Sequence, residues 1–134
     1  MTAGAANGRC TVAVCDDQDG FRRVVAIVLG LASEIEVVGE ASDGRQAIAL
    51  AEKHQPDVLL LDIAMPEMDG LEALPRVREV SPATRVVMLT GVTAASVRER
   101  ALAAGASAFI EKGIDIDDLA ERIVEICRGG GATR

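Results

Sequence analysis

The chain has 134 residues, of which 49% are hydrophobic and 26% charged, a balance typical of one soluble globular domain with a substantial core. Its formal net charge of −7 argues against a nucleic-acid-binding surface, and its two phenylalanines are too few for an aromatic platform on which bases could stack. No apolar stretch is long enough to span a membrane, and the first residues lack the basic-then-apolar pattern of a secretion signal, so we expect a cytoplasmic protein.

Short apolar strands alternate with segments of helical spacing in the first part of the chain. TVAVC (11–15) predicts a strand, IEVVGEA (35–41) a half-exposed strand, and VLLLD (58–62) a strand fit to be buried on both faces. Helices are expected at 21–31, 44–54 and 71–80, and Pro75 should kink the third of these or make it begin irregularly. The apolar residues that suggest the first two helices are Phe21, Val24, Val25, Val28 and Leu31, then Ala47, Ile48 and Ala51.

The same alternation continues to the end. VVMLT (86–90) and AFIE (108–111) predict strands, with a helix at 92–104 between them. Asp115 or Asp117 can cap a last helix, whose inner stripe is Leu119, Ile123 and Ile126. We expect residues 1–8 to be flexible, residues 9–127 to form the domain, and RGGGATR (128–134) to be a tail or the start of a linker.

The cysteines and the single histidine suggest no further chemistry. Cys10, Cys15 and Cys127 are odd in number and lack the spacing of a metal site, so we expect small, buried apolar residues. His54 is expected at the surface, near the end of a helix.

Five strand–helix units predict an α/β fold with a doubly wound parallel sheet, covered by helices on both faces. Ligands of such sheets bind beyond the carboxyl ends of the strands. Polar residues collect there in this sequence: Asp16, Asp17, Asp62, Thr90 and Lys112. Three carboxylates that meet would raise one another's pKa, and a hard divalent cation such as Mg²⁺ would relieve the repulsion.

Each of these residues also has an ordinary structural explanation. A single Asp after a strand is more often a helix cap, a Lys is usually solvated, and a Thr favours strands in its own right. Their joint placement at the ends of four strands is what indicates a site.

The segments VAVCDD, LLLDIAMPEMDG, VVMLTG and AFIEKG, in this order and spacing, resemble the receiver domains of two-component response regulators over about residues 9–127. The runs LDIAMPEMDGLEAL and ALAAGASAFIEKG are most similar to receivers that precede a LuxR/NarL-type helix-turn-helix domain. The resemblance implies a flavodoxin-like fold with strand order 2-1-3-4-5. It also implies a histidine kinase as partner and a DNA-binding output domain outside this chain, and it leaves homodimerisation open.

The resemblance further implies site roles. Asp62 would accept a phosphoryl group, while Asp17, Asp62 and the backbone carbonyl of Ala64 would hold Mg²⁺ and Asp16 would act through a bound water. Thr90 and Lys112 would contact the phosphoryl oxygens.

The family's switch involves the Thr90 position and an aromatic residue on the last strand, which is Phe109 here; an ordinary core Phe explains that residue equally well. Two new hydrogen bonds to a charged group are worth roughly 1.5–3 kcal/mol each. About 5.5 kcal/mol shifts a two-state equilibrium from 1:99 to 99:1, so a phosphorylation switch is feasible.

Three positions depart from the family pattern. Gly113 follows Lys112 where the family usually has a proline after a cis peptide, so we expect a trans peptide and a looser loop. Ala64 and Val92 are apolar where other receivers often carry polar side chains, so we expect slow loss of the phosphoryl group.

Other functions remain as alternatives. The chain could be a stand-alone receiver that acts by protein–protein contact or phosphorelay, although RGGGATR resembles a linker. An aspartyl-phosphate phosphohydrolase would need a second aspartate two residues after the nucleophile, where Asp62 is followed by Ile63 and Ala64. No nucleotide-binding glycine motif follows the first strand. We therefore expect a phosphorylation-controlled switch rather than a multiple-turnover enzyme.

Overall fold

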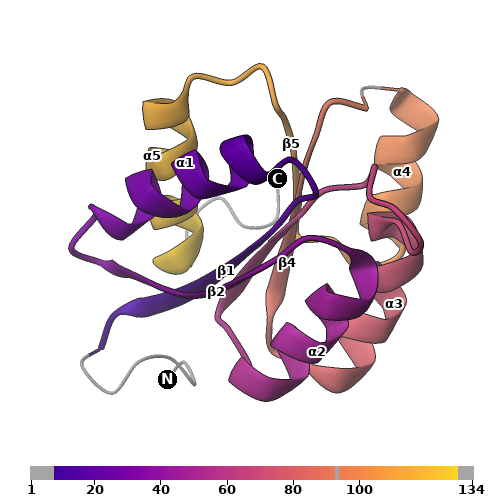
Figure 1. Cartoon of the computed structure of the whole chain (residues 1–134), viewed down its shortest axis with the longest axis horizontal. Coiled ribbons are helices and arrows are strands. Elements are labelled where there is room, and N and C mark those ends of the chain that lie inside the picture. Colours follow the sequence, from indigo (N-terminus) through magenta and orange to yellow (C-terminus); the bar gives the residue numbers. More distant parts are fainter. Residues whose placement is uncertain (1–7, 93, 130–134) are drawn as a thin grey trace.

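A computed structural model describes residues 8–92 and 94–129 of the chain, so the expectations for residues 1–7 and 130–134 lie outside the described residues. Five strands and five helices alternate in these ranges (Figure 1). The strands are β1 (Cys10–Cys15), β2 (Ile35–Ala41), β3 (Val58–Leu61), β4 (Arg85–Thr90) and β5 (Ala108–Glu111). The helices are α1 (Asp19–Gly30), α2 (Gly44–His54), α3 (Gly70–Val80), α4 (Ala95–Ala103) and α5 (Ile116–Cys127).

The strands form one parallel sheet in the order β2-β1-β3-β4-β5, which confirms the predicted topology. Helices α1 and α5 cover one face, and α2, α3 and α4 cover the other (Figure 1). Alternate residues of each central strand supply the two cores, as Val14 and Cys15 of β1 do. A strand buried on both faces needs a continuous apolar run, which explains the run in β3.

Helix α1 differs from the sequence expectation in the face that it buries. Val25, Ala26 and Leu29 are buried, whereas Val24 is half exposed and Leu31, just after the helix, is 80% exposed. This segment has apolar residues on more than one face, so its spacing predicts a helix without deciding which face lies inward.

Helices α3 and α4 differ from expectation at their starts. Helix α3 begins regularly at Gly70, because Asp69 accepts a hydrogen bond from the Glu72 amide and the Glu72 side chain accepts one from the Asp69 amide. The helix then runs without a break across Pro75. Helix α4 begins at Ala95 rather than at Val92, and of its described residues only Ala101 is buried. The apolar pattern of α4 is therefore too weak to predict where the helix begins.

The last helix and the end of α2 agree with expectation. The Asp115 carboxylate accepts a hydrogen bond from the Asp117 amide and caps α5. Leu119, Ile123 and Ile126 form its buried stripe, and His54 is exposed at the end of α2.

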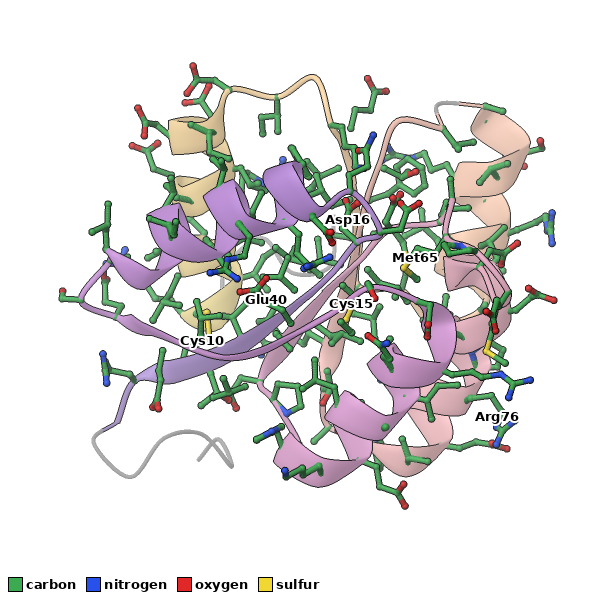
Figure 2. The ribbon with its side chains drawn as sticks, viewed as in Figure 1. Cys10, Cys15, Asp16, Glu40, Met65 and Arg76 are labelled. Carbon is green, nitrogen blue, oxygen red and sulfur yellow. A yellow bond between two sulfur atoms is a disulfide. The ribbon has the colours of Figure 1, made fainter. Side chains whose placement is uncertain are left out.

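The expectation for the cysteines was wrong for two of the three. Cys10, at the start of β1, and Cys127, at the end of α5, form a disulfide with their Cα atoms 5.8 Å apart (Figure 2). Their separation of 117 residues hid the pairing from any argument based on local spacing. Cys15 is a buried free cysteine, as expected, and burial raises the pKa of its thiol, so it stays protonated and unreactive.

No helix in the described ranges is both long and apolar enough to cross a membrane.

Candidate functional site

The carboxyl ends of the central strands bring the predicted site residues together. Cys15 of β1 pairs with Leu61 of β3, so Asp16 and Asp62 leave the sheet side by side. The Asp62 amide donates to the Cys15 carbonyl at 3.0 Å, which fixes the Asp62 backbone to the neighbouring strand. Thr90 ends β4, and the Lys112 amide donates to the Thr90 carbonyl at 3.0 Å, which fixes the lysine backbone at the same edge.

Three carboxylates meet at this edge. Asp16, Asp17 and Asp62 each offer an oxygen within 4.8 Å of the others. Asp16 and Asp62 are each only 2% exposed, whereas Asp17 faces solvent. Burial raises the pKa of Asp62, and the Asp16 charge raises it further, while Lys112 and the Thr90 hydroxyl act in the opposite direction. Burial and the neighbouring Asp16 charge thus both disfavour the ionised form of Asp62.

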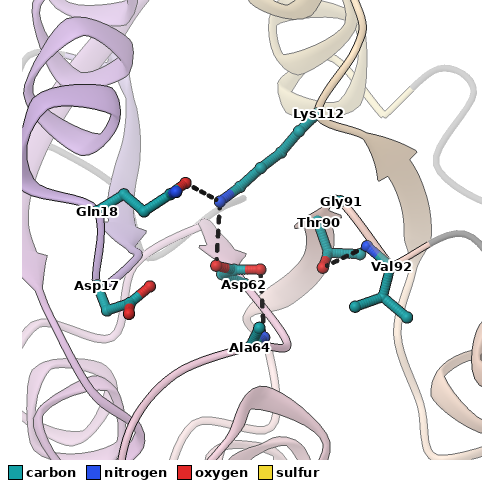
Figure 3. A pocket seen from close by; sticks show the side chains of 8 residues that line it. All are labelled: Asp17, Gln18, Asp62, Ala64, Thr90, Gly91, Val92 and Lys112. Carbon is teal, nitrogen blue, oxygen red and sulfur yellow. Dashed lines mark hydrogen bonds and ion pairs between the residues drawn. The ribbon is translucent and has the colours of Figure 1, made fainter.

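Lys112 balances the carboxylates. Its Nζ lies 2.8 Å from Asp16 Oδ2. The same nitrogen lies 3.1 Å from Asp62 Oδ2 (Figure 3). It also donates to Gln18 Oε1 at 2.8 Å and lies 4.8 Å from the centre of the Phe21 ring. Burial alone would lower the pKa of this amine, but its bonds to the two carboxylates outweigh burial and raise the pKa. Lys112 is therefore a firmly held cation.

The donor set fits a hard divalent cation. Asp16 Oδ2 is buried and, within the described residues, accepts no aligned hydrogen bond, although the Lys112 ammonium is close by. The cluster contains only carboxylate oxygens, which Mg²⁺ prefers and which give zinc no nitrogen or sulfur ligand. Asp17, Asp62 and Ala64 line one pocket (Figure 3).

Thr90 and its neighbours form the opposite wall of this pocket. The Val92 amide donates to Thr90 Oγ1 at 3.2 Å, and the Ala64 amide approaches Asp62 Oδ1 at 3.4 Å (Figure 3). Ala64 and Val92 add only apolar side chains to the pocket.

The loop after Asp62 is packed too closely to allow a side chain at Gly70. The Gly70 amide donates to the Ile63 carbonyl at 2.8 Å, and an added Cβ would lie 2.1 Å from the Asp62 carbonyl oxygen. This contact explains why Gly70 follows the capping residue Asp69. Asp69 and Gly70 entered the sequence comparison only as the end of LLLDIAMPEMDG and were not used to predict the helix start, although a DG pair before a helical segment is a recognisable start signal.

Gln18 is a further residue whose role was not predicted from the sequence. It stands at the N-cap of α1, where Ser, Thr, Asp or Asn is usual. Among the described residues no side-chain hydrogen bond caps α1 there, and the Gln18 side chain reaches Lys112 instead. An unusual N-cap residue directly after two aspartates was the available signal.

Phe109 lies on β5, away from the pocket lining. It is 8% exposed and packs in the core beneath α2, α3 and α4, with the Arg98 guanidinium 5.7 Å from its ring centre. The Lys112–Gly113 peptide is trans, as predicted, since the described residues contain no cis peptide.

Comparison with known proteins gives consistent matches. Residues 12–124 match the family model of the response regulator receiver domain. The chain is 43% identical over 130 residues to a protein-glutamate methylesterase/protein-glutamine glutaminase from Alkalilimnicola ehrlichii, covering 89% of this chain and 33% of that protein. It is 37% identical over 114 residues to the response regulator VraR from Staphylococcus aureus, covering 85% of this chain and 54% of VraR.

Among solved structures, the signal receiver domain of the response regulator NarL from Mycobacterium tuberculosis superposes with a TM-score of 0.84 at 35% identity. The match covers 90% of this chain and 98% of the NarL receiver chain. The two curated relatives are longer, so the chain matches only a third to a half of their length.

Proposed function

The chain belongs to the response regulator receiver domain family, and from that premise we propose that it is a phosphorylation-controlled switch with Asp62 as its phosphoacceptor. One observation carries the proposal: a buried carboxylate at the sheet edge has a lysine ammonium 3.1 Å from one oxygen and two further carboxylates beside it. A carboxylate nucleophile among such groups suits phosphoryl transfer, which depends on position and charge balance.

In the proposed reaction an Asp62 oxygen attacks the phosphorus of a phosphohistidine on a histidine kinase. A P–O bond forms while the P–N bond breaks, and the departing imidazole keeps the electron pair and takes up a proton. Lys112 then pairs with one phosphoryl oxygen and the Thr90 hydroxyl donates to another. When bound by Asp17, Asp62 and the Ala64 carbonyl, with Asp16 acting through a water, Mg²⁺ supplies further positive charge.

The switch would run from Thr90 to the α4 side of the domain. The hydroxyl is held by the Val92 amide, so its movement toward a phosphoryl group would change the loop before α4. Helix α4 buries only Ala101 among its described residues, so a change of its position costs little free energy. Phe109 packs on the same side, and we propose that it repacks when Thr90 moves.

We place the receiver at residues 9–127 of a cytoplasmic regulator that encounters its kinase in that compartment. The LuxR/NarL-like sequence favours a DNA-binding output that controls transcription, joined through the segment that begins near residue 128. The similarity to a methylesterase shows that receivers of this sequence type also occur in proteins named for an enzymatic activity. A stand-alone receiver is the alternative, whereas phosphohydrolase activity is disfavoured because Ala64 offers no acid or base.

The test is the intact mass of the protein after incubation with acetyl phosphate, with and without Mg²⁺. The wild type should gain one phosphoryl group only with Mg²⁺, Asp62→Ala should gain none, and Asp118→Ala, an exposed aspartate on α5, should behave like the wild type. Equal phosphorylation of Asp62→Ala and wild type would refute the assignment.

The apolar pocket wall suggests a long-lived acyl phosphate. Neither Ala64 nor Val92 can orient a water for hydrolysis, so a polar residue such as Glu at either position should shorten the lifetime about tenfold. Loss of phosphate from the purified protein, followed by mass, measures this. Rapid loss that neither substitution changes would contradict the explanation.

A further inference from the structure

The Lys112 ammonium has two kinds of partner. Asp16 and Asp62 are ionic partners that the proposed function also needs for the cation and for the phosphoryl group. Gln18 and Phe21 are neutral partners from the start of α1. The ammonium nitrogen lies 2.8 Å from the Gln18 amide oxygen and 4.8 Å from the centre of the Phe21 ring. Neither Gln18 nor Phe21 can ionise, so both stay neutral when the charges of the site change.

The lysine needs such support. Its stem of four carbons is flexible. A Cβ added at Gly113, the next residue, would have no described atom within 4 Å. The chain after the lysine therefore provides little packing. When Asp62 carries a phosphoryl group, its carboxylate charge no longer holds the ammonium directly.

The start of α1 does not depend on the side chain of Gln18. Its backbone amide donates to Asp16 Oδ1 at 2.8 Å, and its carbonyl accepts from the Arg22 amide at 2.9 Å. The Arg22 guanidinium also donates to the Asp16 carbonyl at 2.7 Å. The local fold should therefore survive a change of the Gln18 side chain.

We propose that Gln18 and Phe21 are positioning residues that hold the Lys112 ammonium at the phosphoryl site throughout the reaction. The inference rests on the proposed function of Asp62 as phosphoacceptor. Gln18 acts by accepting a hydrogen bond, and Phe21 acts through the electrostatic attraction of its ring face for a cation.

The first test compares Gln18→Met, which keeps the length of the side chain but removes the acceptor, with the wild type. The rate of phosphorylation by acetyl phosphate at saturating Mg²⁺ should fall about two- to tenfold, as expected for one lost hydrogen bond. Phe21→Leu should lower the rate about two- to fivefold, and Phe21→Tyr, which keeps the ring face, should restore it. Unchanged rates in Gln18→Met and Phe21→Leu would overturn the inference.

The second test asks whether Gln18 acts through Lys112. In a Lys112→Ala background, Gln18→Met should have no further effect on the residual rate. An equal fold loss in both backgrounds would show that Gln18 acts on the structure in some other way.

The third test needs no phosphoryl transfer. The chain has two lysines, Lys53 and Lys112, so ¹⁵N-lysine labelling gives one ammonium signal from the site and one from the exposed Lys53 as internal control. Gln18→Met should speed proton exchange of the Lys112 ammonium several-fold and leave Lys53 unchanged. Unchanged Lys112 exchange would refute the contact, whereas a wild type that never gains a phosphoryl group would refute the proposed function instead.

Discussion

The two edges of the sheet treat polar groups in opposite ways. At the amino ends of the strands, polar groups are paired: the Thr11 amide donates to Asp57 Oδ2 at 2.9 Å, and the Asp57 amide donates to Thr11 Oγ1 at 3.0 Å. Thr84, almost fully buried, donates to the Pro56 carbonyl at 2.6 Å. The Cys10–Cys127 disulfide lies at the same edge.

At the carboxyl ends, like charges are gathered instead. Asp62 is buried beside Asp16, its pKa is raised, and one Asp16 oxygen is left without an aligned hydrogen bond from the described residues. One edge thus contributes stability, whereas the other brings together buried carboxylates that repel one another. Four variants test this contrast.

Removing the disulfide should have the largest effect on stability. Cys10→Ser combined with Cys127→Ser should lower the free energy of unfolding by about 2–5 kcal/mol, because a covalent link across a long loop restricts the unfolded chain. Urea unfolding under oxidising conditions measures the loss. Reduced wild type should unfold like the double variant, and equal midpoints for oxidised wild type and the variant would contradict the prediction.

At the carboxyl edge, a side chain added at Gly70 should have the second largest effect on stability. Gly70→Ala places a Cβ 2.1 Å from the Asp62 carbonyl oxygen and should destabilise the fold by about 1–3 kcal/mol. It should also slow phosphorylation, since Asp62 must shift. Gly113→Ala is the matched control, because no described atom lies within 4 Å of its Cβ. Similar thermal midpoints for the two variants would count against close packing at Gly70.

Thr84→Val tests the paired edge without a change of shape. The substitution leaves the buried Pro56 carbonyl without its donor, which should cost about 1–3 kcal/mol of unfolding free energy. Ser96→Ala, at an exposed position on α4, should stay within about 0.5 kcal/mol of the wild type. Phosphorylation of Thr84→Val should remain normal at temperatures where it is folded.

Asp62→Asn should have the smallest effect and the opposite sign. The folded protein raises the pKa of Asp62, so it binds this proton more tightly than the unfolded chain, and ionisation weakens the fold as pH rises through the folded pKa. At pH 7 the neutral asparagine should therefore raise the thermal midpoint by a few degrees.

The gain should vanish below about pH 4, where Asp62 is protonated in both states. Thermal midpoints across this pH range, with Glu99→Gln as an exposed control, measure it. A gain that is independent of pH would contradict the electrostatic explanation.

The sequence predicted the sheet and the members of the site because both depend on where strands end. Asp16, Asp62 and Thr90 follow or end apolar runs, and parallel strands bring such ends together. The buried face of α1 was beyond reach, because Val24 and Val25 are equally apolar and only packing distinguishes them.

Contacts across long sequence distances were also beyond reach. Gln18 and Lys112 are 94 residues apart, and neither residue type indicates which side chain it will contact. The disulfide joins residues 117 apart, and three cysteines allow several pairings. The predicted start of α4 was wrong for a local reason, since Ala94 and Ala95 carry no capping side chain.

The disulfide also has a mechanical consequence. It closes a covalent ring from Cys10 to Cys127, and Asp62, Thr90 and Lys112 all lie inside that ring. A pulling force applied outside these two cysteines would pass through the sulfur–sulfur bond and would not load the strands between them. While the bond is intact, tension applied through the two ends of the chain would leave the residues around Asp62 unstrained.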